Sequence, residues 1–360
     1  MSITVVVGTR PEIIKMAPIL RELKRQSISF HFIHTGQHYD YNMSLQFIKE
    51  LDLPKPDHSF KLTNKKPASQ IGEMMKKLDK TLPNLKTRLL LLQGDTNTML
   101  AAALTGVKHS LKVGHVEAGL RSYDWRMPEE HNRRMVDHVS DILFAPTKRA
   151  ERNLIEERVY GKVYVTGNTI IDAVIQNITI AEKHSKIMQS IIFKEFSLAT
   201  LHRAENVDDA KTLKGFIEAF IDSPIPIIFP AHPRTIKRLR QIHMLEKLKN
   251  AKNVQLIPPL GYFDFLVLMK NCRIILTDSG GIQEEATTPC IRKPVLVLRL
   301  STERPEAVEA GFAKVVGVDK KTILKALSES LNENSNLPSN SPFGDGKASQ
   351  RIVKIIKEES

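Results

Sequence analysis

Short apolar runs rich in valine, isoleucine and leucine alternate along this chain with amphipathic segments. The first run, Ile3–Val7, is almost continuously apolar, which is typical of a parallel strand covered on both faces. Pro11 stands where a first helical residue is tolerated, and apolar residues follow it at helical spacing. Because parallel strands need crossover connections, this alternation predicts an α/β protein built from βαβ units, with helices on both faces of each sheet.

The alternation occurs in two sets. Strands of the first set are predicted at Ile3–Val7, 30–34, 89–92, 113–116 and 142–145, with helices from Ala68, from Thr98 and over 129–139. Strands of the second set are predicted at 197–200, 225–229, 254–257, 274–277, 295–298 and 313–316. At about 150 residues per domain, a chain of 360 residues also suggests two domains. We therefore predict two Rossmann-like, doubly wound domains.

A helical stretch over 170–186 separates the two sets. We accordingly predict an N-terminal domain at 1–168 and a nucleotide-binding C-terminal domain at 169–348. The segment 332–346 is rich in Asn, Ser, Pro and Gly and is predicted to be a loop. A C-terminal helix within 349–360 is expected to pack back on the first domain. Two such domains facing each other leave a cleft at the carboxyl ends of their strands, where ligands bind.

Composition excludes several classes of protein. Hydrophobic residues make up 41% and charged residues 26% of the chain, as in soluble globular proteins. No apolar run approaches the ~18 residues that span a bilayer, and no secretion-signal pattern is visible, so we expect a cytoplasmic protein without a membrane partner. Cys272 and Cys290 are too few for a disulfide framework or a cysteine zinc site. His31, His34 and His38 fall at ordinary strand positions and no HExxH motif occurs, so no metal is expected.

The net charge of +13 suits a polyanion or a phosphorylated small molecule, although a solvated basic surface would also account for it. Lysine and arginine are spread along the chain without a block of five or six like charges. No run that interleaves aromatic and basic residues occurs either. Nucleic acid is therefore disfavoured as a partner.

Polar residues that directly follow predicted strands are the candidates for chemistry. Arg10 and Lys15 follow the first strand and begin a helix, a place that suits an anion. Arg10 alternatively is an ordinary surface charge. This turn contains neither the GxGxxG fingerprint of dinucleotide-binding proteins nor a Walker A loop. No nicotinamide cofactor is therefore expected.

Three carboxylates occupy similar positions. Asp95 follows the strand at 89–92, where it could also cap the next helix. Glu117 ends the strand at 113–116, where a cap is less natural. Glu130 begins a helix and could simply pair with Arg133 or Arg134 on the same face. General acid–base catalysis uses paired carboxylates, one protonated and one ionised, and these three are candidates for that work.

The second half of the chain offers a candidate nucleotide site. His202 follows the strand at 197–200, although most single histidines are structural. Ser279, Gly280 and Gly281 follow the strand at 274–277 and begin a helix, where backbone N–H groups can meet a diphosphate. Glu285 could accept from ribose hydroxyls. The remaining candidate, Arg304, lies after the next strand.

The motifs that surround these residues form a specific set. They are GTRPE at 8–12, TGQH at 35–38, QGDT at 93–96, HVEAGLR at 115–121, PEEHNR at 128–133, TLHR at 200–203, DSGGIQEE at 278–285 and TERPE at 302–306. From residue 3 to about residue 317, the chain resembles the non-hydrolysing UDP-N-acetylglucosamine 2-epimerases. The resemblance implies the glycosyltransferase-B (GT-B) fold, a homodimer, no cofactor, and interconversion of UDP-GlcNAc and UDP-ManNAc for cell-surface polysaccharide.

The resemblance also implies roles for residues. Asp95, Glu117 and Glu130 would be the acid–base set for losing UDP together with the C2 proton, which gives a 2-acetamidoglucal intermediate. The charge of the departing diphosphate would be balanced by Arg10, Lys15, His202 and Arg304. Phe265 matches the uracil pocket of the family, or else is a core aromatic. Rival activities are a hydrolysing epimerase that releases ManNAc and UDP, and a glycosyltransferase that uses a UDP-sugar.

Two finer points follow from the resemblance. Gln37, His38 and Gln70 match a second, regulatory UDP-GlcNAc site; without such a site, Gln70 would be an exposed side chain at a helix start. The chain departs from the family where Arg292 replaces the glycine of a Gly-Lys-Pro turn. We expect that replacement to change the local geometry of the turn and not the activity.

Overall fold

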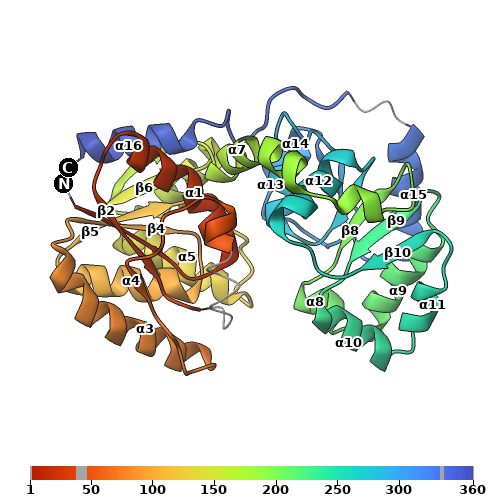
Figure 1. Ribbon diagram of the computed structural model, residues 1–360, viewed down its shortest axis with the longest axis horizontal. Coiled ribbons are helices and arrows are strands. Elements are labelled where there is room, and N and C mark those ends of the chain that lie inside the picture. Colours follow the sequence, from red (N-terminus) through yellow and green to blue (C-terminus); the bar gives the residue numbers. More distant parts are fainter. Residues whose placement is uncertain (1, 38–46, 333–335, 360) are drawn as a thin grey trace. The chain divides into compact units, whose positions relative to one another are not determined.

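The computed structural model describes residues 2–37, 47–332 and 336–359, and it divides the chain into two compact units (Figure 1). Unit 1 comprises Met1–Ala173 and Phe343–Ser360, and unit 2 comprises Val174–Pro342. The division therefore falls inside helix α7 (Thr169–His184), a few residues after the boundary expected at 168. No helix among the described residues is both long enough and apolar enough to cross a membrane.

Unit 1 contains a wholly parallel sheet whose seven described strands run in the order β3-β2-β1-β4-β5-β6-β7. The strands are β1 (Ile3–Val7), β2 (Phe30–His34), β3 (His58–Ser59), β4 (Leu89–Gln93), β5 (Lys112–Val116), β6 (Ile142–Ala145) and β7 (Lys162–Val165). In the centre, Val5 pairs with Phe32 on one side and with Leu91 on the other. β1 and β4 are buried at every residue, which is why their sequences are apolar on both faces.

Helices cover both faces of this sheet, with α1 and α16 above it and α3 and α4 below it in the view of Figure 1. The helices of unit 1 include α1 (Arg10–Arg25), α3 (Pro67–Thr81), the 3-10 helix η1 (Leu82–Leu85), α4 (Asn97–Lys108), α5 (Pro128–Val139), α6 (Lys148–Glu156), the start of α7, and α16 (Ala348–Glu358). Leu78 of α3 and Met99 of α4 pack with Leu90 and Leu92 of β4 in one buried cluster. Burial of this apolar surface holds the helices on the sheet.

The C-terminal helix belongs to unit 1 because buried polar contacts attach it there. Asp172 accepts hydrogen bonds from the backbone N–H groups of Ala348 (3.1 Å) and Ser349 (2.8 Å) and from the Ser349 hydroxyl (2.6 Å). The pKa of Asp172 is raised by burial, against these hydrogen bonds. α16 also packs against α1. The carboxylate of Asp172 therefore satisfies donors at the start of α16 that the helix itself cannot pair.

Unit 2 contains a second parallel sheet, whose described strands run in the order β10-β9-β8-β11-β12-β13. Its strands are β8 (Ser197–Thr200), β9 (Ile227–Pro230), β10 (Val254–Ile257), β11 (Ile275–Thr277), β12 (Val295–Val297) and β13 (Ala313–Val315). Its helices are η2 (Ile187–Ser190), α8 (Ala204–Val207), α9 (Ala210–Ile221), α10 (Pro233–Gln241), α11 (Leu245–Lys249), α12 (Tyr262–Asn271), α13 (Gly280–Ala286), α14 (Pro305–Glu309) and α15 (Lys320–Asn332). Phe220 and Phe229 meet edge to face in its core, with ring centroids 5.4 Å apart.

The two parallel sheets confirm the predicted α/β class, and the predicted strands agree with the observed ones to within two residues at each end. Sequence analysis did not predict β3 and β7, the two edge strands of the first sheet. β3 has two residues, and β7 is exposed or half-buried at every position. Neither strand carries the continuous apolar run that identifies a covered strand.

The departure from the family turn at Arg292 has a clear local consequence. Arg292 has φ +50°, in the left-handed region where glycine avoids the steric cost of a side chain. The Arg292 guanidinium donates from Nε to the carbonyl oxygens of Leu337 and Pro338, each at 3.1 Å, and from Nη2 to that of Leu337. These bonds to the segment before Phe343 help to offset the strain of an arginine in this conformation.

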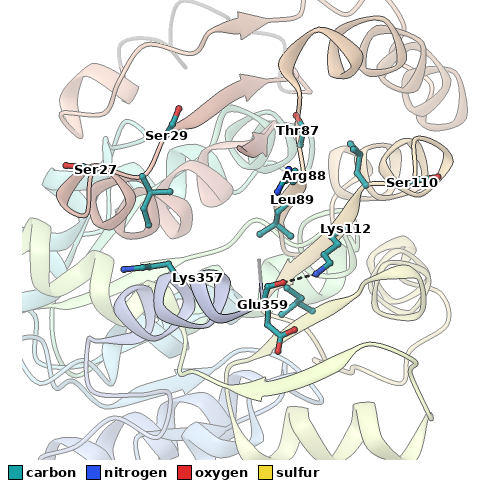
Figure 2. A pocket seen from close by; sticks show the side chains of 12 residues that line it. Ser27, Ser29, Thr87, Arg88, Leu89, Ser110, Lys112, Lys357 and Glu359 are labelled. Carbon is teal, nitrogen blue, oxygen red and sulfur yellow. Dashed lines mark hydrogen bonds between the residues drawn. The ribbon is translucent and has the colours of Figure 1, made fainter. Parts of the chain in front are cut away.

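A hollow of about 970 Å³ lies at the amino edge of the first sheet (Figure 2). Its lining includes Arg88, just before β4, and Lys112, the first residue of β5. Figure 2 shows Lys112 donating from Nζ to the backbone oxygen of Glu359, at 2.7 Å. The candidate residues Asp95 and Glu117 follow the carboxyl ends of β4 and β5. The hollow is therefore at the opposite edge of the sheet from them.

Candidate active site

The turn after β5 holds Glu117 against Lys15 of α1. Lys15 Nζ lies 2.5 Å from Glu117 Oε2, and both side chains are buried. Gln93 Nε2, at the end of β4, donates to the same carboxylate oxygen at 3.0 Å. A lysine beside a buried carboxylate favours the ionised form of that carboxylate. Glu117 is therefore held by a cation and an amide from two other elements of unit 1.

The backbone at Glu117 adopts φ +70°, which is unusual for a residue with a side chain. The N–H groups of Glu117 and Ala118 both donate to the carbonyl oxygen of Phe144, at 3.1 and 3.2 Å, and fix this turn against β6. Strained backbone of this kind is concentrated at functional sites, where the surrounding structure maintains it.

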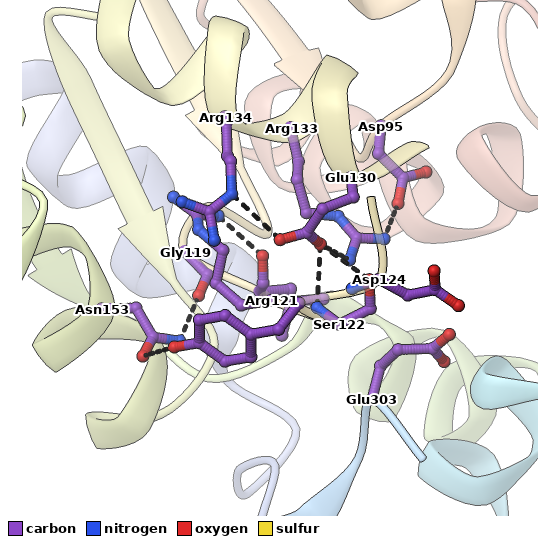
Figure 3. A network of polar contacts seen from close by, with 12 residues as sticks. Asp95, Gly119, Arg121, Ser122, Asp124, Glu130, Arg133, Arg134, Asn153 and Glu303 are labelled. Atoms are coloured by element: carbon purple, nitrogen blue, oxygen red, sulfur yellow. Dashed lines mark hydrogen bonds and ion pairs between the residues drawn. The ribbon is translucent and has the colours of Figure 1, made fainter. Parts of the chain in front are cut away.

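Asp95 and Glu130 are joined by one arginine (Figure 3). Arg133 Nη2 lies 2.5 Å from Asp95 Oδ2, and Arg133 Nη1 lies 2.9 Å from Glu130 Oε2. The N-cap of α4 is Thr96 and not Asp95, so the alternative of Asp95 as a helix cap is wrong. Glu130 pairs with both Arg133 and Arg134, as the spacing on α5 allowed.

Glu130 is completely buried and surrounded by donors. It accepts from the Ser122 backbone N–H (2.8 Å), the Ser122 hydroxyl (2.9 Å), Arg133 (2.9 Å) and Arg134 Nε (3.0 Å). Burial opposes ionisation of Glu130, but these hydrogen bonds and the positive charge of Arg133 hold its pKa below the ordinary value. Glu130 is therefore ionised at neutral pH.

A buried pair lies next to these carboxylates. His115 on β5 contacts Asp137 on α5, with 2.7 Å between Nδ1 and Oδ1, and its Nε2 lies 2.8 Å from the Gly94 carbonyl oxygen. Arg121 Nη1 lies 2.7 Å from Asp137 Oδ2. Burial raises the pKa of Asp137, but the bonds from His115 and Arg121 lower it below its ordinary value overall. This pair connects the turn at Gly94 to helix α5.

Each of the three candidate carboxylates thus contacts a cation, whereas the sequence argument expected one protonated member. The carboxyl group whose pKa burial raises toward neutrality is Glu12, which sequence analysis did not single out. Desolvation raises the pKa of Glu12 from 4.5 to about 7, against hydrogen bonds from the Thr96 hydroxyl and the N–H groups of Gly8 and Thr9. The spacing of Thr9 and Glu12 matches a capping box. This sequence signal could have identified the contact between the Glu12 carboxyl group and the backbone of Thr9 at the start of α1.

Arg10 begins α1 and is half-buried, with its guanidinium carbon 5.8 Å from the centre of the Phe47 ring. Gln37 and Gln70 lie together: Gln70 Nε2 lies 3.4 Å from the Gln37 carbonyl oxygen, while Gln37 Oε1 accepts from Thr98 N at 2.8 Å. Gln70 is buried, so the alternative of an exposed side chain at a helix start is wrong. His38 lies outside the described residues.

In unit 2, His202 is oriented by Asp278. His202 Nδ1 lies 2.9 Å from Asp278 Oδ1, and Asp278 also accepts from the backbone N–H groups of His202 (3.0 Å) and Arg203 (2.9 Å). Burial raises the pKa of Asp278, but the His202 contact and these backbone bonds hold it below its ordinary value. The His202 side chain is half-exposed, and it can therefore meet a ligand while its orientation is fixed.

The other candidates of unit 2 lie around α13. Ser279 is its N-cap, and Gly280 and Gly281 form its first turn. A Cβ atom on Gly280 would lie 3.4 Å from a Glu303 carboxylate oxygen and 3.6 Å from the Arg304 guanidinium carbon, so the Gly280 backbone lies next to these two charged side chains. Arg304 is buried and pairs with Glu284 through Nε. That pairing partly neutralises its charge.

Glu285 lies on α13 and is buried. Phe265 on α12 is half-buried, which leaves part of its ring exposed to solvent. Among the described residues, no three His, Cys, Asp or Glu side chains are grouped to hold a metal ion.

Comparison with known proteins identifies the family. A family model described as UDP-N-acetylglucosamine 2-epimerase matches residues 21–357. A Methanocaldococcus jannaschii protein described as UDP-N-acetylglucosamine 2-epimerase is 46% identical over 366 residues, covering 99% of each chain. The crystal structure of M. jannaschii UDP-GlcNAc 2-epimerase in complex with UDP-GlcNAc and UDP has a TM-score of 0.90 at 44% identity, covering 99% of this chain and 100% of that one. The Neisseria meningitidis UDP-GlcNAc 2-epimerase bound to UDP-GlcNAc has a TM-score of 0.89 at 35% identity, with the same coverage.

The likeness extends over both units, and the two parallel sheets correspond to the GT-B-like fold of these structures. The matched residues include each candidate carboxylate of unit 1 and the His202 and α13 regions of unit 2. The chain belongs to the UDP-N-acetylglucosamine 2-epimerase family and is an isomerase.

Proposed function

We propose that this protein interconverts UDP-GlcNAc and UDP-ManNAc without hydrolysis, by eliminating and re-adding UDP through a 2-acetamidoglucal. The observation that carries the proposal is the pair of carboxylates after adjacent strands β4 and β5, each held by a cation of the same unit. Asp95 is held by Arg133, and Glu117 by Lys15. Two relatives with solved structures are described as bound to UDP-GlcNAc, which supports the substrate.

The reaction needs proton transfer on both faces of C2. That carbon has no adjacent carbonyl, so its hydrogen is weakly acidic. Loss of the C2 proton to a carboxylate, with departure of UDP carrying the C1–O electron pair, leaves a C1=C2 double bond. Re-addition of UDP at C1 and delivery of a proton to the other face of C2 complete the epimerisation. Two or more acid–base groups serve this best, and we propose Asp95 and Glu117, with Glu130 in support.

Unit 2 would hold the nucleotide. We propose that Ser279, Gly280 and Gly281 present backbone N–H groups to the diphosphate, that Glu285 accepts from the ribose, and that Phe265 lies against uracil. Arg10, Lys15, His202 and Arg304 would balance the negative charge that UDP gains as it leaves. The buried pairing of Arg304 with Glu284 gives this arginine a smaller share of that role. No cofactor enters the reaction.

The family resemblance further supports a cytoplasmic homodimer that supplies UDP-ManNAc for polysaccharide synthesis. Analytical ultracentrifugation of the full chain tests the oligomeric state: sedimentation at twice the mass of the chain is expected. A monomer at micromolar concentration would contradict it.

A proton NMR time course in heavy water tests the reaction. With UDP-GlcNAc as substrate, we expect UDP-ManNAc to appear with deuterium at C2, because the proton returned to C2 comes from a group that exchanges with solvent. The integrated C2 proton signal of the product measures this incorporation.

Each other outcome of that time course has a distinct meaning. Product that retains its C2 hydrogen would contradict the elimination route. Accumulation of free ManNAc and UDP would identify a hydrolysing epimerase. An unchanged spectrum, with transfer of GlcNAc only when an acceptor is added, would identify a glycosyltransferase.

The contact between Gln37 and Gln70 supports a regulatory proposal: these residues, with His38, form part of a second UDP-GlcNAc site. An activator that binds the active conformation more tightly shifts the protein toward it. We expect UDP-ManNAc alone to be epimerised with a lag that a trace of UDP-GlcNAc removes. In Gln70→Ala the trace should no longer remove the lag.

Initial rates from UDP-ManNAc, with and without the trace, measure this effect. Ser69→Ala, which changes an exposed neighbour on α3, is the matched control and should behave as the wild type. A wild-type reaction without a lag would contradict regulation, as would a lag that added UDP-GlcNAc does not shorten.

A further inference from the structure

Arg133 has no role in the proposed reaction, although it lies between two of the candidate carboxylates. It projects from α5 and is almost completely buried. One guanidinium nitrogen contacts Asp95 at 2.5 Å and the other contacts Glu130 at 2.9 Å. A planar guanidinium with a fixed fork of donors fixes the orientation of its partners as well as their charge, and it does not lose its proton in proteins.

The two carboxylates that Arg133 joins differ sharply in access. The Asp95 side chain is 32% exposed, whereas the Glu130 side chain is 0% exposed. Both oxygens of Glu130 accept hydrogen bonds, Oε2 from Ser122 and Arg133 and Oε1 from Arg134. A substrate can therefore reach Asp95, whereas the side chain of Glu130 is closed off from it.

Helix α5 also holds Asp95 through its backbone. Asn132 Nδ2 donates to the Asp95 carbonyl oxygen at 2.9 Å. Consecutive residues of one helix thus fix the main chain and the side chain of Asp95. This arrangement is pre-organised, because α5 is anchored by the buried residues Val136 and Asp137.

We propose that Arg133 is a positioning residue that orients Asp95 for proton transfer and places a positive charge beside it, and that Glu130 acts through Arg133 as its buried counter-ion. Arg133 is thereby added to the residues assigned to the site. Glu130 is assigned a role in which it does not exchange protons with the substrate. The inference rests on the proposed function, because it assigns these roles in the same reaction.

Within the described part of unit 1, the charged groups near Asp95 include Arg133 and Glu130 from α5 and Glu12 from α1. Arg133 is the cation among these three. Without it, the neighbours of Asp95 in this set would both be carboxyl groups, and like charges repel one another. The loss of Arg133 therefore has a specific signature on the acid side of the pH profile.

The test is the pH dependence of kcat and KM for UDP-GlcNAc in Arg133→Met, Arg133→Lys and wild type. We expect Arg133→Met to lower kcat by about 100-fold, the effect of a misplaced reacting group. Its KM should change by less than about threefold, because Asp95 acts on the reacting carbon and not on the nucleotide. The acid limb of kcat should move up by about one pH unit.

Arg133→Lys keeps the positive charge but loses the fork of donors. We expect it to restore the acid limb to the wild-type position while kcat recovers only in part. A purely structural role would give equal losses in both variants without moving the limb. Arg134→Met is the matched comparison, since Arg134 also donates to Glu130 but does not contact Asp95. Its acid limb should stay in place.

The inference fails if Arg133→Met leaves the acid limb where it is, or if Arg134→Met moves it equally. It also fails if Glu130→Gln moves the limb while Arg133→Met does not, since Glu130 would then exchange protons itself. Thermal unfolding followed by Trp125 fluorescence identifies any variant that does not fold. Failure of the proposed function is separate: the wild type would then produce no UDP-ManNAc at any pH.

Discussion

Asp95→Asn and Glu117→Gln should each lower turnover of UDP-GlcNAc by at least about 100-fold, the scale of a lost general acid or base. An amide cannot accept the C2 proton, yet it keeps the size of the side chain. Glu130→Gln should cause a loss of similar size by weakening the hold of Arg133 on Asp95. Affinity for UDP, measured by isothermal titration, should change by no more than a few-fold in all three variants.

The neighbouring Glu129 offers a matched control. It stands beside Glu130 on α5 but is exposed. Glu129→Gln removes the same charge from the same helix, and turnover should remain within about twofold of wild type. A variant of Asp95 or Glu117 that lost UDP affinity but kept its turnover at saturation would show that the residue binds UDP and does not transfer protons.

Glu12→Gln should make unit 1 more stable at alkaline pH. The folded state binds the Glu12 proton more tightly than the unfolded chain, because desolvation raises the pKa from 4.5 to about 7. The stability that this proton contributes is complete below pH 4.5 and is lost as the pH rises through 7. The shift corresponds to a decline of about 3 kcal/mol in the free energy of unfolding of the wild type. Glutamine has no proton to lose in this range, so Glu12→Gln does not undergo this decline.

Urea unfolding at pH 5 and pH 8 measures this difference, with fluorescence of Trp125, the single tryptophan, reporting on unit 1. The two proteins should be of similar stability at pH 5, and Glu12→Gln should be the more stable at pH 8. Glu73→Gln is a control of opposite sign. Burial raises the pKa of Glu73, but hydrogen bonds from Asn64 and Thr63 lower it to about 2 overall, so its loss should destabilise the protein at neutral pH. Parallel pH profiles of wild type and Glu12→Gln would contradict the assignment.

The architecture was predictable because covered parallel strands leave a strong mark on the sequence. β1 and β4 are apolar at nearly every position since both faces lie under helices, and their bounds followed from that run. The partly exposed edge strand β7 lacks this mark and was missed. The helix at 351–358 was predictable from its pattern. Its attachment to unit 1 is visible only in the contacts that Ala348 and Ser349 make with Asp172, which precedes them by 176 and 177 residues.

The sequence alone determined which polar residues follow the ends of strands, and therefore which side chains meet at the carboxyl edge of the first sheet. It did not determine their partners. Lys15 and Glu117 are 102 residues apart, and Arg133 and Asp95 are 38 apart, so packing of the helices on the sheet decides both pairs. Burial and contacts then set the ionisation of each carboxyl: Glu12 is desolvated and has a raised pKa, whereas four donors, two of them on arginines, keep Glu130 ionised. Position along the chain is a local property, but dielectric surroundings and neighbouring charges exist only once the chain has folded.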